Sequence, residues 1–178
     1  MPDPAGTTDD RGAPPAKSAI VAALRAALVA RLQAAQSAAA AAFTAATEEE
    51  ARAENKYDTR ALEQSYISAG QHARIATLRD AIAAVSFLTL PATQLTQIGP
   101  CALAHVEIED DATVQRRWLF VLDVGVGEAV VVDGGEVHVC DVRAPLALSL
   151  RGRGAEDVVA LPSRAGGAAR TVTVLQVR

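Results

Sequence analysis

The chain has 178 residues, enough for one compact domain with an extension or for two small domains. Half of the residues are apolar, but many of these are alanine, and the few aromatic residues do not suit a single large globular core. The formal net charge of −4 excludes a strongly basic protein, so direct binding to naked DNA or RNA is not expected.

The N-terminal segment, residues 1–16, is rich in proline, glycine, aspartate and threonine. It has too little apolar surface to offset the entropy of ordering, which predicts a disordered tail. Its polar, acidic start lacks the basic and apolar parts of a signal peptide, and no apolar run reaches the roughly 18 to 20 residues of a membrane span. Two cysteines, Cys101 and Cys140, are too few for a disulfide framework, so a reducing compartment and a cytoplasmic protein are expected.

Two amphipathic helices are predicted after the tail. From Lys17 onward, apolar residues recur three and four positions apart, and no Gly or Pro occurs before Gly70, so the first helix is expected to reach about residue 52. A second apolar stripe runs from Leu62 to Val85 and ends before Pro91. The stripes are narrow, which predicts a monomer with an antiparallel coiled-coil arm over residues 17–90. An alanine-rich bundle element or a homodimeric coiled coil is the alternative.

The connection between the two helices, residues 47–60, is strongly charged. Five acidic residues against three basic ones leave a net charge of −2 at the most exposed point of the predicted arm. The acidic residues are Glu48, Glu49, Glu50, Glu54 and Asp58. Most such clusters are simply solvated loops at the ends of helices.

Beyond the helices, the pattern changes to short β-branched runs separated by Gly and Asp pairs. About five strands in a mostly antiparallel sheet are predicted. The stretch 147–150, between Pro145 and Gly152, is the only part of this half expected to form a short helix, which would cross the sheet. The fold class is therefore α+β. It has three parts: the tail 1–16, the coiled-coil arm 17–90 and a small antiparallel β-domain at 91–178.

The stretch from Ala144 to Val159 resembles the C-terminal domain of the bacterial transcription elongation factors GreA and GreB, a small FKBP-like β-domain. That domain carries a Ser-Pro-(Ile/Leu)-(Ala/Gly)-x-x-Leu-(Ile/Leu)-Gly-(Lys/Arg) pattern, then an acidic turn and Asp-Val-Val. In the helical half, Glu54-Asn55, Tyr57 and Glu63-Gln64 fall where the family has Glu-Asn, Tyr and Glu-Gln. The matching residues of the C-terminal pattern are Pro145, Leu146, Ala147, Leu150, Gly152, Arg153, Asp157, Val158 and Val159.

The resemblance implies a polymerase accessory factor that is not an enzyme by itself. In the family, the arm enters the secondary channel of bacterial RNA polymerase, where acids at its tip help to hold the second catalytic Mg²⁺ during cleavage of backtracked RNA. It thus implies RNA polymerase as partner, indirect contact with the 3′ end of the nascent RNA, no contact with a membrane, and no cofactor beyond a shared Mg²⁺. The implied tip residues are Glu50, Glu54, Asn55 and Asp58, with Glu54 as the shared metal ligand. The implied polymerase-binding residues are Pro145, Leu146, Ala147, Leu150, Gly152 and Arg153.

Three functions stay open on this evidence: an elongation regulator, an active transcript-cleavage factor, and a coiled-coil adaptor unrelated to polymerase. Two departures from the family bear on the choice. The family's acid three residues before the tip Glu corresponds to Ala51, and the segment between Asn55 and Tyr57 is one residue shorter. Loss of a metal-holding carboxylate is expected to weaken cleavage more than docking.

Two Cys–His pairs offer the residue types of a structural Zn²⁺ site, Cys101 with His105 and His138 with Cys140. Neither spacing is usual for zinc, and lone Cys and His commonly pack in apolar strands. No metal site in the isolated protein is therefore expected.

Overall fold

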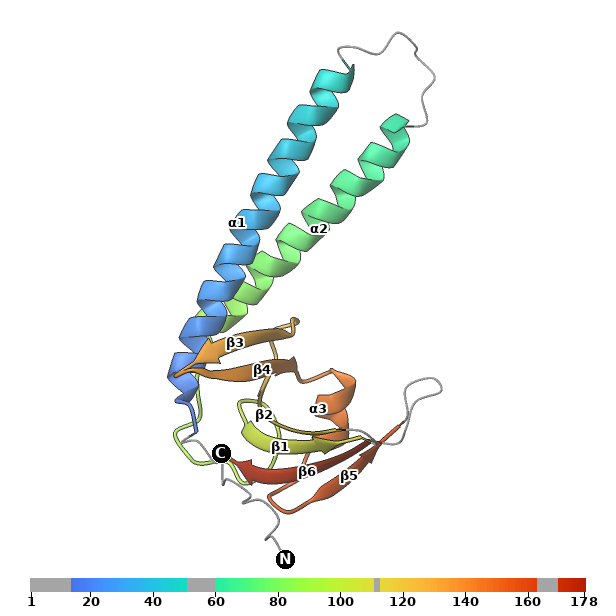
Figure 1. The fold of residues 1–178 in the computed structure, drawn as a ribbon. Coiled ribbons are helices and arrows are strands. Elements are labelled where there is room, and N and C mark those ends of the chain that lie inside the picture. Colours follow the sequence, from blue (N-terminus) through green and yellow to red (C-terminus); the bar gives the residue numbers. More distant parts are fainter. Residues whose placement is uncertain (1–13, 51–59, 111–112, 163–169) are drawn as a thin grey trace, which may run out of the picture.

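The computed structural model describes residues 14–50, 60–110, 113–162 and 170–178, and only the backbone of 46–50 and 60–68. It is an α+β protein with N-terminal helices and a mixed six-stranded sheet (Figure 1). The elements are α1 (Lys17–Glu50), α2 (Arg60–Ser86), β1 (Leu103–Glu109), β2 (Val114–Leu122), β3 (Glu128–Val132), β4 (Gly135–Asp141), α3 (Pro145–Leu150), β5 (Val158–Leu161) and β6 (Arg170–Val177).

The strands follow the order β3-β4-β2-β1-β6-β5 in the sheet. The sheet is mostly antiparallel, in agreement with the prediction, but β2 and β4 are parallel, which makes the sheet mixed. After β2 the chain passes to the outer strand β3 and returns as β4, which lies between β3 and β2. The return is a tight turn at Asp133 and Gly134, whose φ angles of 52° and 79° suit a two-residue hairpin. Strand β5 was not among the predicted strands.

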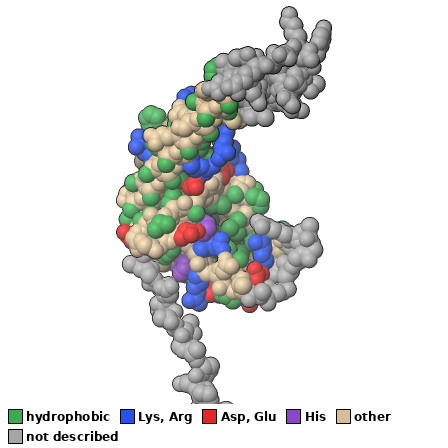
Figure 2. Space-filling view, turned by 45° about the horizontal axis from the view of Figure 1, so that its top comes forward, with side chains coloured by type: hydrophobic (Ala, Val, Ile, Leu, Met, Phe, Trp, Pro, Cys, Tyr) green, Lys and Arg blue, Asp and Glu red, His purple; other side chains and the backbone are tan. Residues whose placement is uncertain are grey.

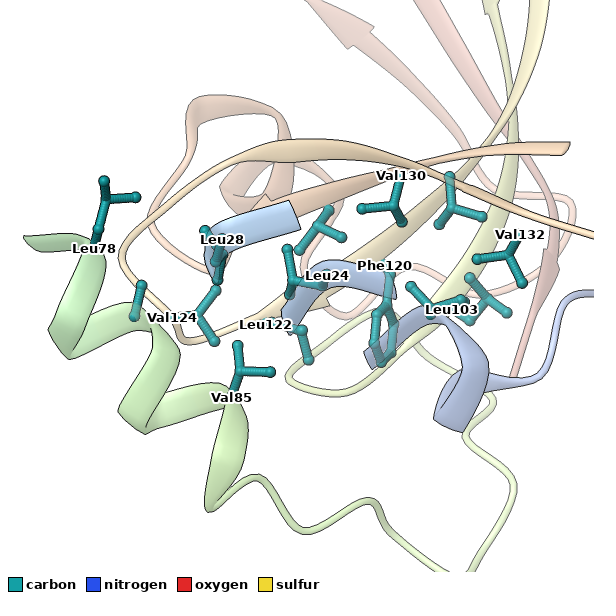
Figure 3. Packing of buried hydrophobic residues seen from close by; sticks show 14 residues of the cluster. Leu24, Leu28, Leu78, Val85, Leu103, Phe120, Leu122, Val124, Val130 and Val132 are labelled. Atoms are coloured by element: carbon teal, nitrogen blue, oxygen red, sulfur yellow. The ribbon is translucent and has the colours of Figure 1, made fainter. Parts of the chain in front are cut away.

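Alternate residues of the strands divide the apolar side chains between two clusters, one on each face of the sheet. On one face, which we call the helix side, α1 and α2 pack on the strands (Figure 3). On the other, the α3 side, Ala147 and Leu150 of α3 pack on the strands. The base of the helix pair is therefore part of the same core as the sheet. Fully buried members on the helix side are Ile20, Leu24, Leu28, Phe120, Leu122 and Val137.

The helix pair packs closely near the sheet and opens away from it (Figure 1). Among the described side chains, the buried residues of α1 end at Leu28 and those of α2 begin at Ile75. Farther out α1 is mostly alanine, and Phe43 is 75% exposed. Alanine side chains bury little apolar area and hold the helices together weakly. The predicted long antiparallel coiled coil is therefore not observed in the described part of the arm.

The stretch Lys17–Ala45 of α1 is long and apolar enough to cross a membrane, by length and composition only, with a mean hydropathy of 1.4. This differs from the expectation that no such run exists, because the alanine residues raise the average. The finding is weak evidence, since core helices of other proteins pass the same test. Here Ile20, Leu24 and Leu28 of the stretch are buried.

Charges of both signs share the surface. On the face seen in Figure 2, Lys and Arg side chains of the described residues are interspersed with Asp and Glu. Within the described ranges, two ion pairs join separate elements: Arg31 of α1 with Glu128 of β3, and Arg116 of β2 with Glu107 of β1 at 2.7 Å. This mixed surface agrees with the modest negative net charge.

Candidate protein-binding surface

The residues at its two ends determine where the short helix α3 begins and stops. Pro145 occupies the first turn, where its missing N–H costs nothing, and Ala144 before it is extended (φ −64°, ψ 142°). The hydroxyl of Ser149 donates to the carbonyl of Pro145 at 3.0 Å. Gly152, two residues after the helix, has a φ of +76°, a left-handed conformation that favours glycine. The segment from Pro145 to Gly152 in the sequence pattern thus forms one short helix, with Pro145 at its start and Gly152 just after its end.

The segment after α3 is anchored to the loop that precedes β1. The N–H of Gly152 donates to the carbonyl of Ile98, and the N–H of Ile98 donates to the carbonyl of Arg153, both at 2.8 Å. The N–H of Gly154 donates to Oδ2 of Asp157 at 2.8 Å. These bonds hold the segment containing Arg151 and Arg153 in a fixed path across the surface.

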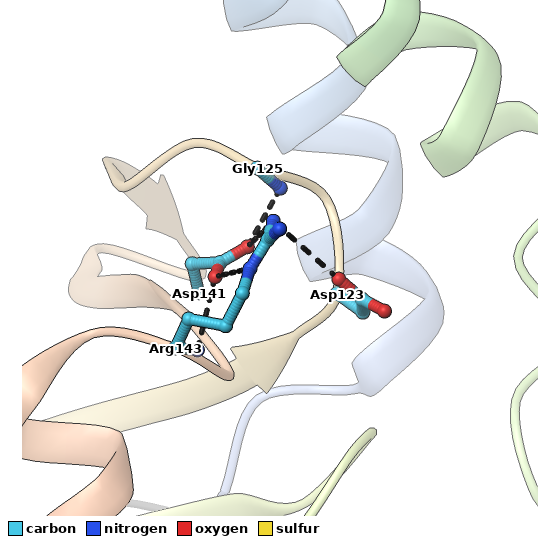
Figure 4. A network of polar contacts seen from close by, with 4 residues as sticks. All are labelled: Asp123, Gly125, Asp141 and Arg143. Carbon is cyan, nitrogen blue, oxygen red and sulfur yellow. Dashed lines mark hydrogen bonds and ion pairs between the residues drawn. The ribbon is translucent and has the colours of Figure 1, made fainter.

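The start of α3 is held by a polar network around Asp141 (Figure 4). One carboxylate oxygen of Asp141 accepts hydrogen bonds from the N–H and the Nε of Arg143, at 3.0 and 2.9 Å. The other oxygen accepts from the N–H of Gly125 at 2.7 Å and from Nη2 of Arg143 at 3.3 Å. Asp141 therefore ties the β4–α3 turn to the loop after β2.

These bonds shift the ionisation of Asp141. The hydrogen bond from Arg143 lowers the pKa of Asp141 from 3.8 to about 2, although burial opposes the shift. The guanidinium of Arg143 contacts Asp141 and lies 3.7 Å from Asp123, so it helps to fix this turn. Sequence proximity alone, two positions from Asp141, is the signal that would have suggested this role.

The candidate polymerase-binding residues fall into two groups by exposure. Ala147 and Leu150 are buried in the α3-side cluster, where they pack α3 on the sheet. Leu146 is half-buried. Pro145, Gly152 and Arg153 are exposed and lie on one continuous stretch of chain. Two further residues share this surface: Leu148, which is 53% exposed, and Arg151.

A cavity of about 610 Å³ lies beside α3. Its walls combine apolar side chains from α3 and the sheet with charged side chains of both signs, because Asp110 lines it together with Arg117 and Arg170. No local sequence pattern could have predicted this cavity, because its walls come from five separate stretches of the chain. The lining residues that carry this description are Ile108, Leu146, Leu161, Pro162, Arg117 and Arg170.

The tip of the arm lies largely outside the described residues. Glu54, Asn55 and Asp58 belong to residues 51–59, which the structure does not describe, and so does Ala51. Glu50 is the last residue of α1, and its side chain is not described. The predicted roles of these residues stay predictions.

The Cys and His residues considered for zinc are not brought together. Within the described ranges, no group of three or more His, Cys, Asp or Glu side chains could hold a metal ion. His105 stacks on Trp118 with ring centroids 4.6 Å apart, and Nε2 of His138 lies 2.7 Å from Oε1 of Glu136. Both Cys residues are free thiols.

No protein-family model matches the chain, and no curated protein matches it. Among solved structures, it is similar to one described as the transcription factor Gfh1, with 20% identity, 88% of this chain and 94% of that chain covered, and a TM-score of 0.36. A second is the GreA factor homolog 1 (Gfh1) protein of Thermus thermophilus, with 24% identity, 86% and 94% covered, and a TM-score of 0.32. A third is the elongation factor GreA/GreB from Nitrosomonas europaea, with 14% identity, 60% and 89% covered, and a TM-score of 0.33.

Proposed function

We propose that this chain is a Gre-like transcription elongation regulator. It binds bacterial RNA polymerase through the surface around α3 and inserts the connection between α1 and α2 into the polymerase's secondary channel. It acts in the cytoplasm as a monomer, has no enzymatic activity of its own, and meets the 3′ end of the nascent RNA only inside the polymerase. It does not bind DNA directly.

The observation that carries this proposal is the combination, in one chain, of the Pro145–Val159 pattern with a long projecting helix pair. The pattern supports a family-like docking surface, since Pro145, Gly152 and Arg153 are exposed while Ala147 and Leu150 secure α3 from below. The helix pair supports an insertion role, because α1 has 34 residues and its base is fixed in the core on the helix side. At 1.5 Å per residue, α1 is about 50 Å long.

A regulator is favoured over an active cleavage factor by one residue. Ala51 stands where the family has a tip acid, and a methyl group cannot hold a divalent cation, which requires oxygen ligands. Glu54 alone would bind the second Mg²⁺ more weakly than the pair of tip acids found in the family. The proposed arm therefore occupies the channel and competes with cleavage factors, with Glu54 and Asp58 as its acidic contacts there.

Copurification with core RNA polymerase tests the proposal. The full chain is expected to bind. In a transcription elongation assay, a variant in which residues 39–70 are replaced by a short glycine-containing turn is expected to have no effect on elongation. This variant keeps the buried base from Ile20 to Leu28 and from Ile75 to Val85, so it leaves the shared core intact. Absence of binding, or an elongation effect that survives without the distal arm, would contradict the proposal. A stable dimer in light scattering that needs residues 39–70 would favour the adaptor instead.

A further inference from the structure

Arg31 joins α1 to the sheet near the point where the helix leaves it. Its Nη1 donates a hydrogen bond to Oε2 of Glu128, the first residue of β3. The two residues are 97 positions apart in the sequence, and their side chains are 40% and 21% exposed. We call this contact the α1–β3 ion pair.

The α1–β3 ion pair lies just beyond the buried part of α1. Ile20, Leu24 and Leu28 are spaced four residues apart and are fully buried. Beyond Arg31, Ala34 and Ala38 line an open cleft of about 300 Å³ together with Gln71 and Arg74 of α2. Among the described residues, the ion pair is therefore the polar contact with the sheet that lies farthest along α1.

Because the α1–β3 ion pair lies near the base of α1, a small rotation of the helix there displaces its far end by a large distance. Nineteen residues of α1 follow Arg31, a length of about 28 Å at 1.5 Å per residue. A rotation of about 10° at Arg31 would move the far end of α1 by about 5 Å. The base of α2 is expected to move together with α1. Nε of Arg25 donates a hydrogen bond to Oγ of Ser86 at 3.2 Å, and Leu78 of α2 packs in the helix-side cluster with α1.

We propose that the α1–β3 ion pair sets the direction of the arm relative to the sheet, which makes Arg31 and Glu128 positioning residues. The apolar packing of Leu24 and Leu28 holds the base of α1 on the sheet, but it is non-directional and does not by itself set the angle at which the helix leaves the sheet. A hydrogen bond between charged groups has a preferred length and angle and restricts the direction of the helix. The consequence for polymerase rests on the proposed function: the α3 surface and the arm tip can engage together only if their relative direction is kept.

Distances between spin labels test the direction of the arm without polymerase. Thr44→Cys on α1 and Val158→Cys on β5 provide exposed labelling sites, in a parent with Cys101→Ser and Cys140→Ala that unfolds cooperatively. Glu128→Lys breaks the α1–β3 ion pair. Glu107→Lys is the matched control, because its ion pair with Arg116 is equally exposed (39% and 24%) but lies wholly between β1 and β2.

Glu128→Lys is expected to broaden or shift the distance distribution by about 3 Å for each 10° of rotation, because Thr44 lies 13 residues, about 20 Å, beyond Arg31. Glu107→Lys is expected to leave it unchanged, and the exchange Arg31→Glu with Glu128→Lys is expected to restore it. An unchanged distribution in Glu128→Lys, equal broadening in Glu107→Lys, or an exchange that fails to restore the distribution would each overturn the proposal.

The same variants separate this inference from the proposed function. If wild type binds polymerase, Glu128→Lys is expected to keep docking through α3 while losing potency in competition with a cleavage factor, and the exchange is expected to recover it. If wild type does not bind polymerase, the proposed function fails, and the distance measurement still decides the role of the α1–β3 ion pair.

Discussion

Leu119 and Phe120 are consecutive residues of β2, yet they lie in different hydrophobic clusters. Phe120 belongs to the helix side together with Leu24 of α1, and Leu119 belongs to the α3 side together with Leu150. One strand thus joins the base of the arm to the candidate docking surface through the thickness of the sheet. Damage to either cluster is therefore expected to affect the whole protein.

Leu24→Ala is expected to destabilise the protein by about 2–5 kcal/mol, because Leu24 is fully buried between α1 and the sheet. Leu148→Ala, at a site 53% exposed, is the matched control and is expected to change stability by less than about 0.5 kcal/mol. Urea unfolding followed by Trp118 fluorescence and by circular dichroism measures both. Separate helix and sheet transitions in Leu24→Ala would contradict a shared core.

Asp141→Asn is expected to cost about 1–2 kcal/mol at pH 7, since the pKa of Asp141 is lowered to about 2 by Arg143. The sign follows from the lowered value: the contribution is complete above the ordinary pKa of 3.8 and is lost as the pH falls toward 2. The difference between wild type and variant should therefore shrink between pH 4 and 2. Asp123→Asn is the control; Asp123 is 72% exposed, and a loss below about 0.5 kcal/mol is expected. A difference that stays constant down to pH 2 would contradict the assignment.

Gly152→Ala and Gly70→Ala are expected to act in opposite directions. Neither added methyl group would meet an atom within 4 Å, so backbone conformation decides the outcome. At a φ of +76°, Gly152→Ala should cost about 1–2 kcal/mol. Gly70 lies inside α2, where alanine should add up to about 1 kcal/mol. Thermal unfolding of the two variants measures this, and shifts of the same sign would refute it.

Leu148→Glu is expected to weaken polymerase binding by roughly tenfold, about 1.4 kcal/mol, because it places a charge on the exposed side of α3. Val131→Glu is the control, since Val131 is also exposed (69%) but lies on β3, outside the Pro145–Val159 pattern. Titration of labelled protein with core polymerase compares them. Equal losses would show that the α3 surface has no special part in binding.

Ala51→Asp is expected to increase the release of short 3′ RNA fragments from stalled, backtracked polymerase, because it restores the second acid of the family pattern. Affinity should change little, since the arm length and the α3 surface are kept. Glu54→Ala in the same background should abolish the gain. If Ala51→Asp binds as wild type does and releases no more RNA, the missing acid is not what limits cleavage.

Local patterns predicted the local elements well. The spacing of apolar residues predicted the start of the first helix at Lys17. The β-branched runs predicted five of the strands, namely β1, β2, β3, β4 and β6. The burial of Ala147 and Leu150 agrees with their spacing of three on one helix face.

Contacts between distant segments were not predictable in the same way. The parallel pairing of β2 with β4 depends on where β3 is placed, and the Arg31–Glu128 contact joins residues 97 positions apart. The extent of helix pairing was overestimated, because alanine satisfies a helical pattern while offering little surface to bury.

The shared core on the helix side also sets an order of events during synthesis. Leu24 and Phe120 lie 96 residues apart in one cluster, so the apolar face of α1 leaves the ribosome long before its sheet partners exist. At about 5–20 residues per second, that interval is roughly 5–20 s. During this time Ile20, Leu24 and Leu28 form an exposed apolar stripe on the nascent chain, which makes this segment prone to aggregation until β2 has been synthesised.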